Sequence, residues 1–316
     1  MLPLDFSAAR NAAVSSPSPE PDAQVLEVAT WFRSFPTMDQ LFATSLRQAI
    51  DEVLDGQRTG RYDITADTVE RTEKTYLGTK VEIIIRAAFN IPRGTKMDYL
   101  VAGHEVDAKF TLGDNWTIPS EAQGHICLLM MAADSRSSFR VGLLRITDSV
   151  LNPGENRDKK RSLSRHGRAA VYWLSLNGVL PENTLLHLPT TDRKAIFSCP
   201  DGQARTDEFF RRVQRKIVNR STVLTVAMQN DSLKRVRDAR DHLRPEGIII
   251  LGGTRKEHQR IAAELHLPVP TGAEWVAARV TPAHHGASQP VATIGGAVFT
   301  LAGPGTEPTE APRVAG

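Results

Sequence analysis

The chain has 316 residues, enough for two domains of ordinary size. Hydrophobic residues make up 41% and charged residues 24%, as in soluble globular proteins, and no apolar run reaches the roughly 20 residues of a membrane-spanning helix. The beginning of the chain lacks the basic and apolar regions of a secretory signal, and the only cysteines are Cys127 and Cys199. We therefore expect a cytoplasmic protein with no membrane partner and with free thiols.

The net charge of +3 is unevenly distributed. Residues 157–168 hold six Lys or Arg against one Asp, and residues 205–260 hold 14 Lys or Arg against seven acids. The remainder of the chain is therefore acidic on balance. A basic second half indicates a polyanionic partner held mainly by that half.

Composition divides the chain into five parts. Residues 1–22 and 303–316 are rich in small residues and Pro, which predicts disordered tails. Residues 156–168 are polar and basic, which is typical of a linker. This linker would separate a first domain, 23–155, from a second domain, 169–302.

The first domain reads as helices followed by strands. Apolar spacing predicts helices over 23–32, 38–54 and 75–89. Strands are expected over 97–102 and 105–112, joined by a tight turn at Gly103-His104, and again over 125–133 and 139–146. This order predicts an α+β or α/β fold, with a mixed sheet flanked by helices.

The second domain is predicted to be mostly helical. We expect a helix over 168–176, an extended segment over 185–198 and a helix capped by Thr206. Helices over 221–229 and 232–243 follow, separated by Asn230-Asp231, and then a strand over 248–251 and a helix over 256–265. Two short helices joined by a brief turn indicate a helix-turn-helix.

The strongest chemical pattern is MDYLVAGHEVDAKF, which begins at Met97. Side chains alternate along a strand, so Asp107 and Lys109 share one face. The hairpin can bring Asp98 to the same place, and Glu82 lies at the rim of the apolar face of the preceding helix. The pattern therefore predicts three carboxylates and one ammonium at a single site.

This set suits phosphodiester hydrolysis. Mg²⁺ takes oxygen ligands and keeps several waters, so Asp98 and Asp107 could bind it, with Glu82 as a third ligand. Lys109 would orient the attacking water and stabilise charge in the transition state. The alternative is an ordinary acid–lysine pair on a solvated strand.

Other polar residues near this pattern have simpler explanations. Glu105 is expected at the rim rather than as a ligand, and Asp114 and Asp134 are expected in turns. His104 is expected in the hairpin turn. His284 and His285 lack partners at the spacing of a metal site.

The second predicted helix of the helix-turn-helix is basic. Its inner face would carry Leu233, Val236 and Leu243, with Ala239 nearby. Lys234, Arg235, Arg237 and Arg240 would reach the major groove. Phosphate contacts would come from Arg211, Arg212, Arg215 and Lys216. The alternative is a solvated basic helix.

An acid in a helix followed by D-x8-D-x-K across a hairpin resembles the PD-(D/E)xK nuclease core. More narrowly, the chain resembles the NaeI-type restriction endonucleases, in TMDQL, LDGQRTGRYDI and TVAMQNDSLKRVRDAR. The resemblance implies that Glu82, Asp98, Asp107 and Lys109 occupy the four active-site positions of the family. Met97 stands where the generic motif has Pro, and Phe42 to Val53 looks inserted after TMDQL, which puts sequence specificity most in doubt.

The resemblance also implies an activity, a cofactor and partners. It indicates a type IIE restriction endonuclease that acts as a homodimer on double-stranded DNA, with Mg²⁺, at a GC-rich palindrome such as GCCGGC. The C-terminal domain, similar to the DNA-binding domain of the catabolite activator protein, would bind a second DNA copy as activator. A methyltransferase for the same site is a further expected partner. Two alternatives stay open: a non-catalytic, site-specific DNA-binding regulator, and a repair or recombination nuclease.

Overall fold

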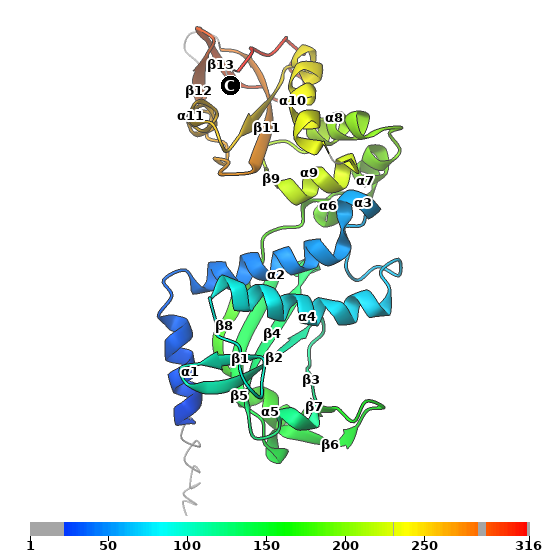
Figure 1. Ribbon diagram of the computed structural model, residues 1–316. Coiled ribbons are helices and arrows are strands. Elements are labelled where there is room, and N and C mark those ends of the chain that lie inside the picture. Colours follow the sequence, from blue (N-terminus) through cyan, green and yellow to red (C-terminus); the bar gives the residue numbers. More distant parts are fainter. Residues whose placement is uncertain (1–21, 230, 284–288, 315–316) are drawn as a thin grey trace, which may run out of the picture.

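The computed structural model describes residues 22–229, 231–283 and 289–314, which form two lobes joined at a narrow waist (Figure 1). Residues 1–21, which belong to the expected N-terminal tail, lie outside the described residues. Asn230, His284 and His285 also lie outside them. Among the described helices, none has the length and apolar character needed to cross a membrane.

Four helices belong to the first half of the chain: α1 (Ala23–Arg33), α2 (Met38–Leu54), α3 (Gly56–Thr59) and α4 (Arg71–Ala88). The Asp22 carboxylate caps α1 by accepting from the backbone N–H of Gln24 and Val25. Helix α4 begins before the predicted Thr75 because Glu70 and Glu73 form a capping box at its start. The predictions for α1 and α2 are confirmed.

A five-stranded sheet forms the centre of the first lobe. Its strands are β1 (Tyr99–Val101), β2 (His104–Thr111), β4 (Ile126–Ala133), β5 (Ser138–Arg145) and β8 (Tyr172–Val179), in the order β1-β2-β4-β5-β8. Strands β2 and β4 are parallel, and the other neighbours are antiparallel. The sheet is mixed, as predicted. The β1–β2 turn lies at Ala102-Gly103, both with positive φ, and not at Gly103-His104.

Each face of this sheet is covered. Strand β4 is buried along its whole length, so its side chains enter two cores in alternation. Leu128 and Met130 pack with α2 and α4, whereas Cys127 and Leu129 pack on the opposite face. There a small sheet with the order β3-β7-β6 covers the strands, together with the short helix α5 (Arg165–Ala169). The strands of this small sheet are β3 (Thr117–Ile118), β6 (Leu151–Glu155) and β7 (Arg161–Leu163).

The proposed linker over 156–168 is part of this lobe. It forms the tip of the β6–β7 hairpin, strand β7 and the start of α5, and the chain then returns to the central sheet as β8. The expected helix over 168–176 is therefore wrong: β8 occupies most of it. The hairpin is polar because it is largely exposed, and the bulged pairing of β8 with β5 breaks the alternation that marks a strand.

The second lobe contains helices and a further sheet. Its elements are α6 (Thr184–His187), α7 (Thr190–Phe197), α8 (Gly202–Arg212), β9 (Ile217–Asn219), α9 (Arg220–Ala227), α10 (Ser232–Leu243), β10 (Ile248–Gly252), α11 (Lys256–Glu264), β11 (Glu274–Pro282), β12 (Val291–Ile294) and β13 (Ala297–Leu301). The sheet has the order β10-β11-β13-β12, and β9 also pairs with β11.

Three predictions for this lobe need correction. The segment 185–198 is helical rather than extended, as α6 and α7. Asp201, not Thr206, caps α8, and the Thr206 hydroxyl donates to the Gly202 carbonyl inside the helix. The expected tail after residue 302 packs on the lobe through 314: Ala311 is buried, and its N–H donates to the Arg244 carbonyl.

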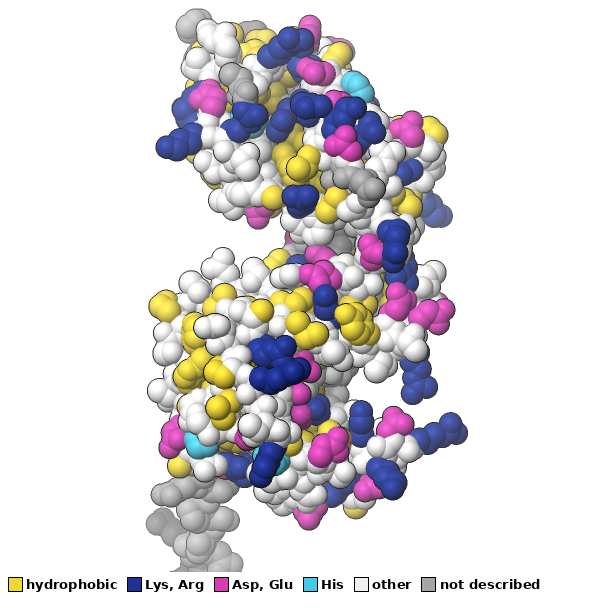
Figure 2. All heavy atoms as spheres, viewed as in Figure 1, with side chains coloured by type: hydrophobic (Ala, Val, Ile, Leu, Met, Phe, Trp, Pro, Cys, Tyr) yellow, Lys and Arg dark blue, Asp and Glu magenta, His cyan; other side chains and the backbone are white. Residues whose placement is uncertain are grey.

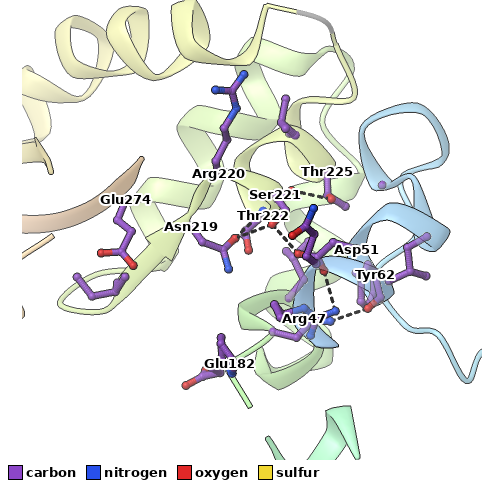
Figure 3. A pocket seen from close by; sticks show the side chains of 18 of the residues that line it. Arg47, Asp51, Tyr62, Glu182, Asn219, Arg220, Ser221, Thr222, Thr225 and Glu274 are labelled. Atoms are coloured by element: carbon purple, nitrogen blue, oxygen red, sulfur yellow. Dashed lines mark hydrogen bonds and ion pairs between the residues drawn. The ribbon is translucent and has the colours of Figure 1, made fainter. Parts of the chain in front are cut away.

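The lobes meet where α2 and α3 reach α9. Gly56 starts α3 so close to α9 that a Cβ there would lie 2.1 Å from the Thr225 hydroxyl oxygen. Beside it, the Ser221 hydroxyl donates to the Asp51 carboxylate over 2.7 Å (Figure 3). Arg47, buried in α2, contacts Asp51 as well, which joins the helix layer of one lobe to the helices of the other.

Candidate active site and DNA-binding surface

The β1–β2 hairpin brings Asp98 and Asp107 together. Tyr99 pairs with Val106 in the antiparallel register, so the next position along places Asp98 opposite Asp107. Directly opposite residues of an antiparallel pair point to the same face. The Asp98 carboxylate is fixed there because it accepts a 2.7 Å hydrogen bond from the backbone N–H of Ala108.

Lys109 lies on the same face of β2. Its Nζ is 2.5 Å from Asp107 Oδ2 and donates to the Ala108 carbonyl at 3.2 Å. Asp107 is buried, and its partner across the β2–β4 pairing is Cys127, whose thiol is 3.5 Å from the same carboxylate. The side-chain alternation predicted for this strand is thus observed.

Glu82 approaches from α4 at the edge of the sheet. The Tyr99 hydroxyl donates to the Glu82 backbone carbonyl over 2.8 Å, which anchors this turn of α4 beside β1. The Glu82 carboxylate is half-buried and lies 3.9 Å from Arg86 Nη1, one helical turn further on. The fourth expected residue therefore reaches the rim of the same site.

Burial and crowding both act on the carboxyl groups of this site. Burial raises the pKa of Asp107, against the lowering effect of Lys109, and the neighbouring Asp98 raises it further. Burial also raises the pKa of Glu82, and the charge of Asp98 adds to that effect. The carboxyl groups of Asp107 and Glu82 thus lie in surroundings that disfavour their charged form.

A divalent metal ion at this place would favour the charged form of these carboxyl groups. Asp98 and Asp107 supply hard oxygen ligands, and Mg²⁺ is commonly bound by one or two carboxylates together with waters and substrate phosphates. No three His, Cys, Asp or Glu side chains in the described part of the chain converge as a complete metal site. Asp98 and Asp107 could hold such an ion, with Glu82 beside them at the rim.

Nearby acids and histidines have structural partners. Glu105 accepts from the backbone N–H groups of residues 95–97 and from the Thr95 hydroxyl, which lowers its pKa to about 2. His104 begins β2 and lies 2.7 Å from Glu27. Asp114 follows β2 in an exposed loop, as expected. Asp134 opens the 3₁₀ turn between β4 and β5, as expected, but it is also buried and pairs with Arg47 at 2.6 Å.

The second lobe carries the predicted pair of helices, α9 and α10. Met228 takes the left-handed conformation that ends α9, a position where Gly is the usual residue. Val236, Ala239 and Leu243 face the core as expected, but Leu233 is 47% exposed. The inward assignment of Leu233 is therefore wrong.

The eight basic residues expected to contact DNA differ in exposure and in the partners that they have within the lobe. Lys234 and Arg237 are exposed on α10, and Lys216 is exposed as well, although Arg237 lies 3.7 Å from Asp238 and Lys216 lies 3.9 Å from Glu182. Arg235 donates to Gln229, and Arg240 donates to the Ile250 carbonyl beneath the helix. Three others already have partners within the lobe: Arg211 with Glu208 and Glu246, Arg212 with Glu208 and Asp192, and Arg215 with the Ala302 carbonyl.

Sequence reasoning missed one member of this basic surface. Arg255 is exposed just before α11, and burial together with the charge of Arg255 lowers the pKa of Arg240. It was missed because the sequence prediction considered the basic residues of a single helix, and Arg255 lies beyond the end of α10. Lys and Arg side chains gather across this face of the upper lobe in Figure 2.

A cavity of about 950 Å³ lies between the lobes rather than at the carboxylates. Gln48 and Asp55 line it from the first lobe, and Asn219 and Thr222 from the second. Figure 3 shows Arg47 and Asp51 facing Ser221 at this place.

The family model for the restriction endonuclease NaeI matches residues 26–310. The chain belongs to the NaeI restriction endonuclease family. It is 42% identical over 325 aligned residues to the type II restriction enzyme NaeI of Lentzea aerocolonigenes, covering 99% of this chain and 97% of the relative.

Proposed function

We propose that this chain is a type II restriction endonuclease that cuts both strands of duplex DNA by Mg²⁺-dependent hydrolysis. The observation that carries the proposal is the meeting of Asp98, Asp107 and Lys109 on one face of the β1–β2 hairpin, in a chain of the NaeI family. Asp98 and Asp107 would hold the metal, with Glu82 beside them.

Each protein group has a separate task in the proposed mechanism. When bound, the metal supplies Lewis-acid chemistry at the phosphate and lowers the pKa of water. Lys109 is held against Asp107, where its ammonium orients the attacking water and offsets charge that develops on the phosphoryl oxygens. Glu82, at the rim, receives or relays a proton through water.

Digestion of plasmid DNA tests this proposal. With Mg²⁺ we expect discrete fragments with 5′-phosphate ends, and Asp107→Asn should abolish cleavage while DNA binding persists. A random smear would favour a repair or recombination nuclease. Binding without any metal-dependent cleavage would favour a non-catalytic regulator.

The pH profile of cleavage gives a second test. The pKa of Asp107 is raised, and this proposed metal ligand must be ionised to bind the ion. The pKa of Glu82, beside it, is raised as well. The cleavage rate should therefore begin to fall, as the solution is made more acidic, at a higher pH than it would with a carboxylate of ordinary pKa. A higher Mg²⁺ concentration should shift this acidic part of the pH profile to lower pH. An acidic part that is insensitive to Mg²⁺ would argue against carboxylate ligands.

We further propose that α9 and α10 form a helix-turn-helix of winged-helix type that binds a second DNA copy as activator. Exposed Lys234 and Arg237 would face the groove, with Lys216 and Arg255 near phosphates. The other predicted contacts, from Arg211, Arg212 and Arg215, would require existing partners to be released. A short duplex carrying the site should speed cleavage of a one-site plasmid, and equal rates would refute the activation.

The remaining expectations follow from the family. We propose a homodimer that acts on a GC-rich palindrome resembling GCCGGC, in the cytoplasm, alongside a methyltransferase for the same sequence. Sequencing of the cut ends identifies the site. Sedimentation with the cognate duplex establishes the number of chains.

A further inference from the structure

Arg86 is a cationic residue at the active site to which no role has yet been given. It follows Glu82 by one turn of α4, so the two side chains share a face. Its Nη1 lies 3.9 Å from Glu82 Oε1, within reach of an ion pair but too far for a hydrogen bond. The side chain is 26% exposed and therefore sits at the boundary of the site.

The guanidinium of Arg86 is incompletely satisfied. Its Nη1 is buried and finds no hydrogen-bond acceptor among the described residues. A buried donor without an acceptor is unfavourable, so such groups in native proteins usually mark the place of a water, an ion or a ligand. The Arg86 side chain as a whole is partly exposed, so the residue lies next to solvent.

The charge balance of the site calls for such a cation. When ionised, Glu82, Asp98 and Asp107 carry three negative charges, and Lys109 supplies one positive charge among them. The exposed Arg93 also acts on Glu82. One divalent ion would only bring the three carboxylates and Lys109 to neutrality. An incoming phosphodiester, whose negative charge grows in the transition state, therefore needs another positive group.

We propose that Arg86 binds the scissile phosphodiester through a non-bridging oxygen, turning from Glu82 to the phosphate in the complex. Arginine suits this task because its planar fork donates two parallel hydrogen bonds to phosphate. This assignment rests on the proposed nuclease function. In Figure 2, Lys and Arg side chains lie directly beside acidic ones over the β1–β2 region of the lower lobe.

Single-turnover cleavage of the mapped site tests the assignment. Arg86→Gln should slow cleavage about 100- to 1,000-fold, the effect of removing one donor to a developing oxyanion. Arg86→Lys should restore part of the rate, since it keeps the charge but not the fork. Arg71→Gln, at the exposed start of α4, is the matched control and should cleave like the wild type.

A binding measurement distinguishes phosphate contact from a structural role. In Ca²⁺, the wild type should bind a duplex with an uncharged methylphosphonate at the scissile position more weakly than the normal duplex. Arg86→Gln should discriminate less between the two duplexes than the wild type does, because only Lys109 and the metal then act on the phosphate. If Arg86→Gln still discriminates between them as the wild type does, the assignment is overturned.

Two further controls separate the possible failures. If Arg86 only holds Glu82 ionised, raising the pH should return the Arg86→Gln rate to that of the wild type, which would overturn the phosphate contact. If the wild type cleaves and Asp107→Asn does not, yet Arg86→Gln cleaves normally, the nuclease function stands and the Arg86 assignment falls. Thermal melting should show Arg86→Gln folded, because its Nη1 makes no hydrogen bond that the substitution would remove.

Discussion

Removal of Arg47 should weaken the fold more than removal of a surface arginine. Arg47 is buried in α2, with Nη1 2.6 Å from Asp134 and Nη2 2.7 Å from Asp51. Arg47→Met keeps most of the side-chain volume but leaves two carboxylates facing each other without a cation. Breaking a buried pair by deleting one partner costs about 3–5 kcal/mol.

The matched control is Arg58→Met. Arg58 pairs with Asp55 at 2.8 Å, but its side chain is 83% exposed. Exposed pairs contribute about 0–1 kcal/mol, so this variant should unfold almost like the wild type. Urea titration followed by tryptophan fluorescence gives the free energies of unfolding. A loss of less than about 1 kcal/mol in Arg47→Met would refute the reasoning.

The pH dependence of the same variant provides an internal check. Burial raises the pKa of Asp51 even with Arg47 present, and loss of the cation raises it further. A carboxyl group whose folded pKa exceeds its unfolded pKa loses its stability contribution as the pH rises through the folded value. The deficit of Arg47→Met should therefore be largest near neutral pH and shrink as the carboxyl groups become protonated.

Three further predictions concern other parts of the chain. Leu243→Ala should cost about 2–5 kcal/mol because the side chain is buried, whereas Leu233→Ala, on an exposed position, should stay within about 0.5 kcal/mol; similar losses in urea titration would contradict the assigned helix face. Glu105→Gln should lower the melting temperature at neutral pH. Since the Glu105 pKa is about 2 in the fold and about 4.3 when unfolded, its contribution is lost as the pH falls through 2, and the difference from the wild type should vanish there. Cys127 should resist thiol reagents until the protein unfolds, because it is buried and burial raises its pKa; modification of Cys127 in the native enzyme as fast as that of the half-buried Cys199 would contradict this packing.

Local signals made much of the first lobe predictable. The apolar stripes of α1 and α2 fixed their bounds, and period-two alternation placed Asp107 and Lys109 on one face of β2. The tight β1–β2 turn implied that Asp98 returns beside them. The candidate site could be predicted from the sequence because its main residues lie within one short hairpin.

Long-range packing explains what the sequence concealed. The β6–β7 hairpin has the polar composition of a linker, and β8 joins the central sheet only after the chain has passed through that hairpin. Asp134 follows β4 where a turn is expected, but Arg47, 87 positions away, makes it a buried partner. Arg255 belongs to the basic face of α10 only through the fold.

The close contact between Gly56 and Thr225 constrains how the lobes can move. Helix α2 lies over the sheet that carries the carboxylates, and directly beyond its end α3 rests on α9 with no space for even one added carbon (Figure 1). If α9 shifts when the second lobe binds a duplex, it would therefore displace α2 as a rigid body relative to the strands beneath it. Gly56→Ala, at the contact of α3 with α9, would alter this coupling between the lobes first.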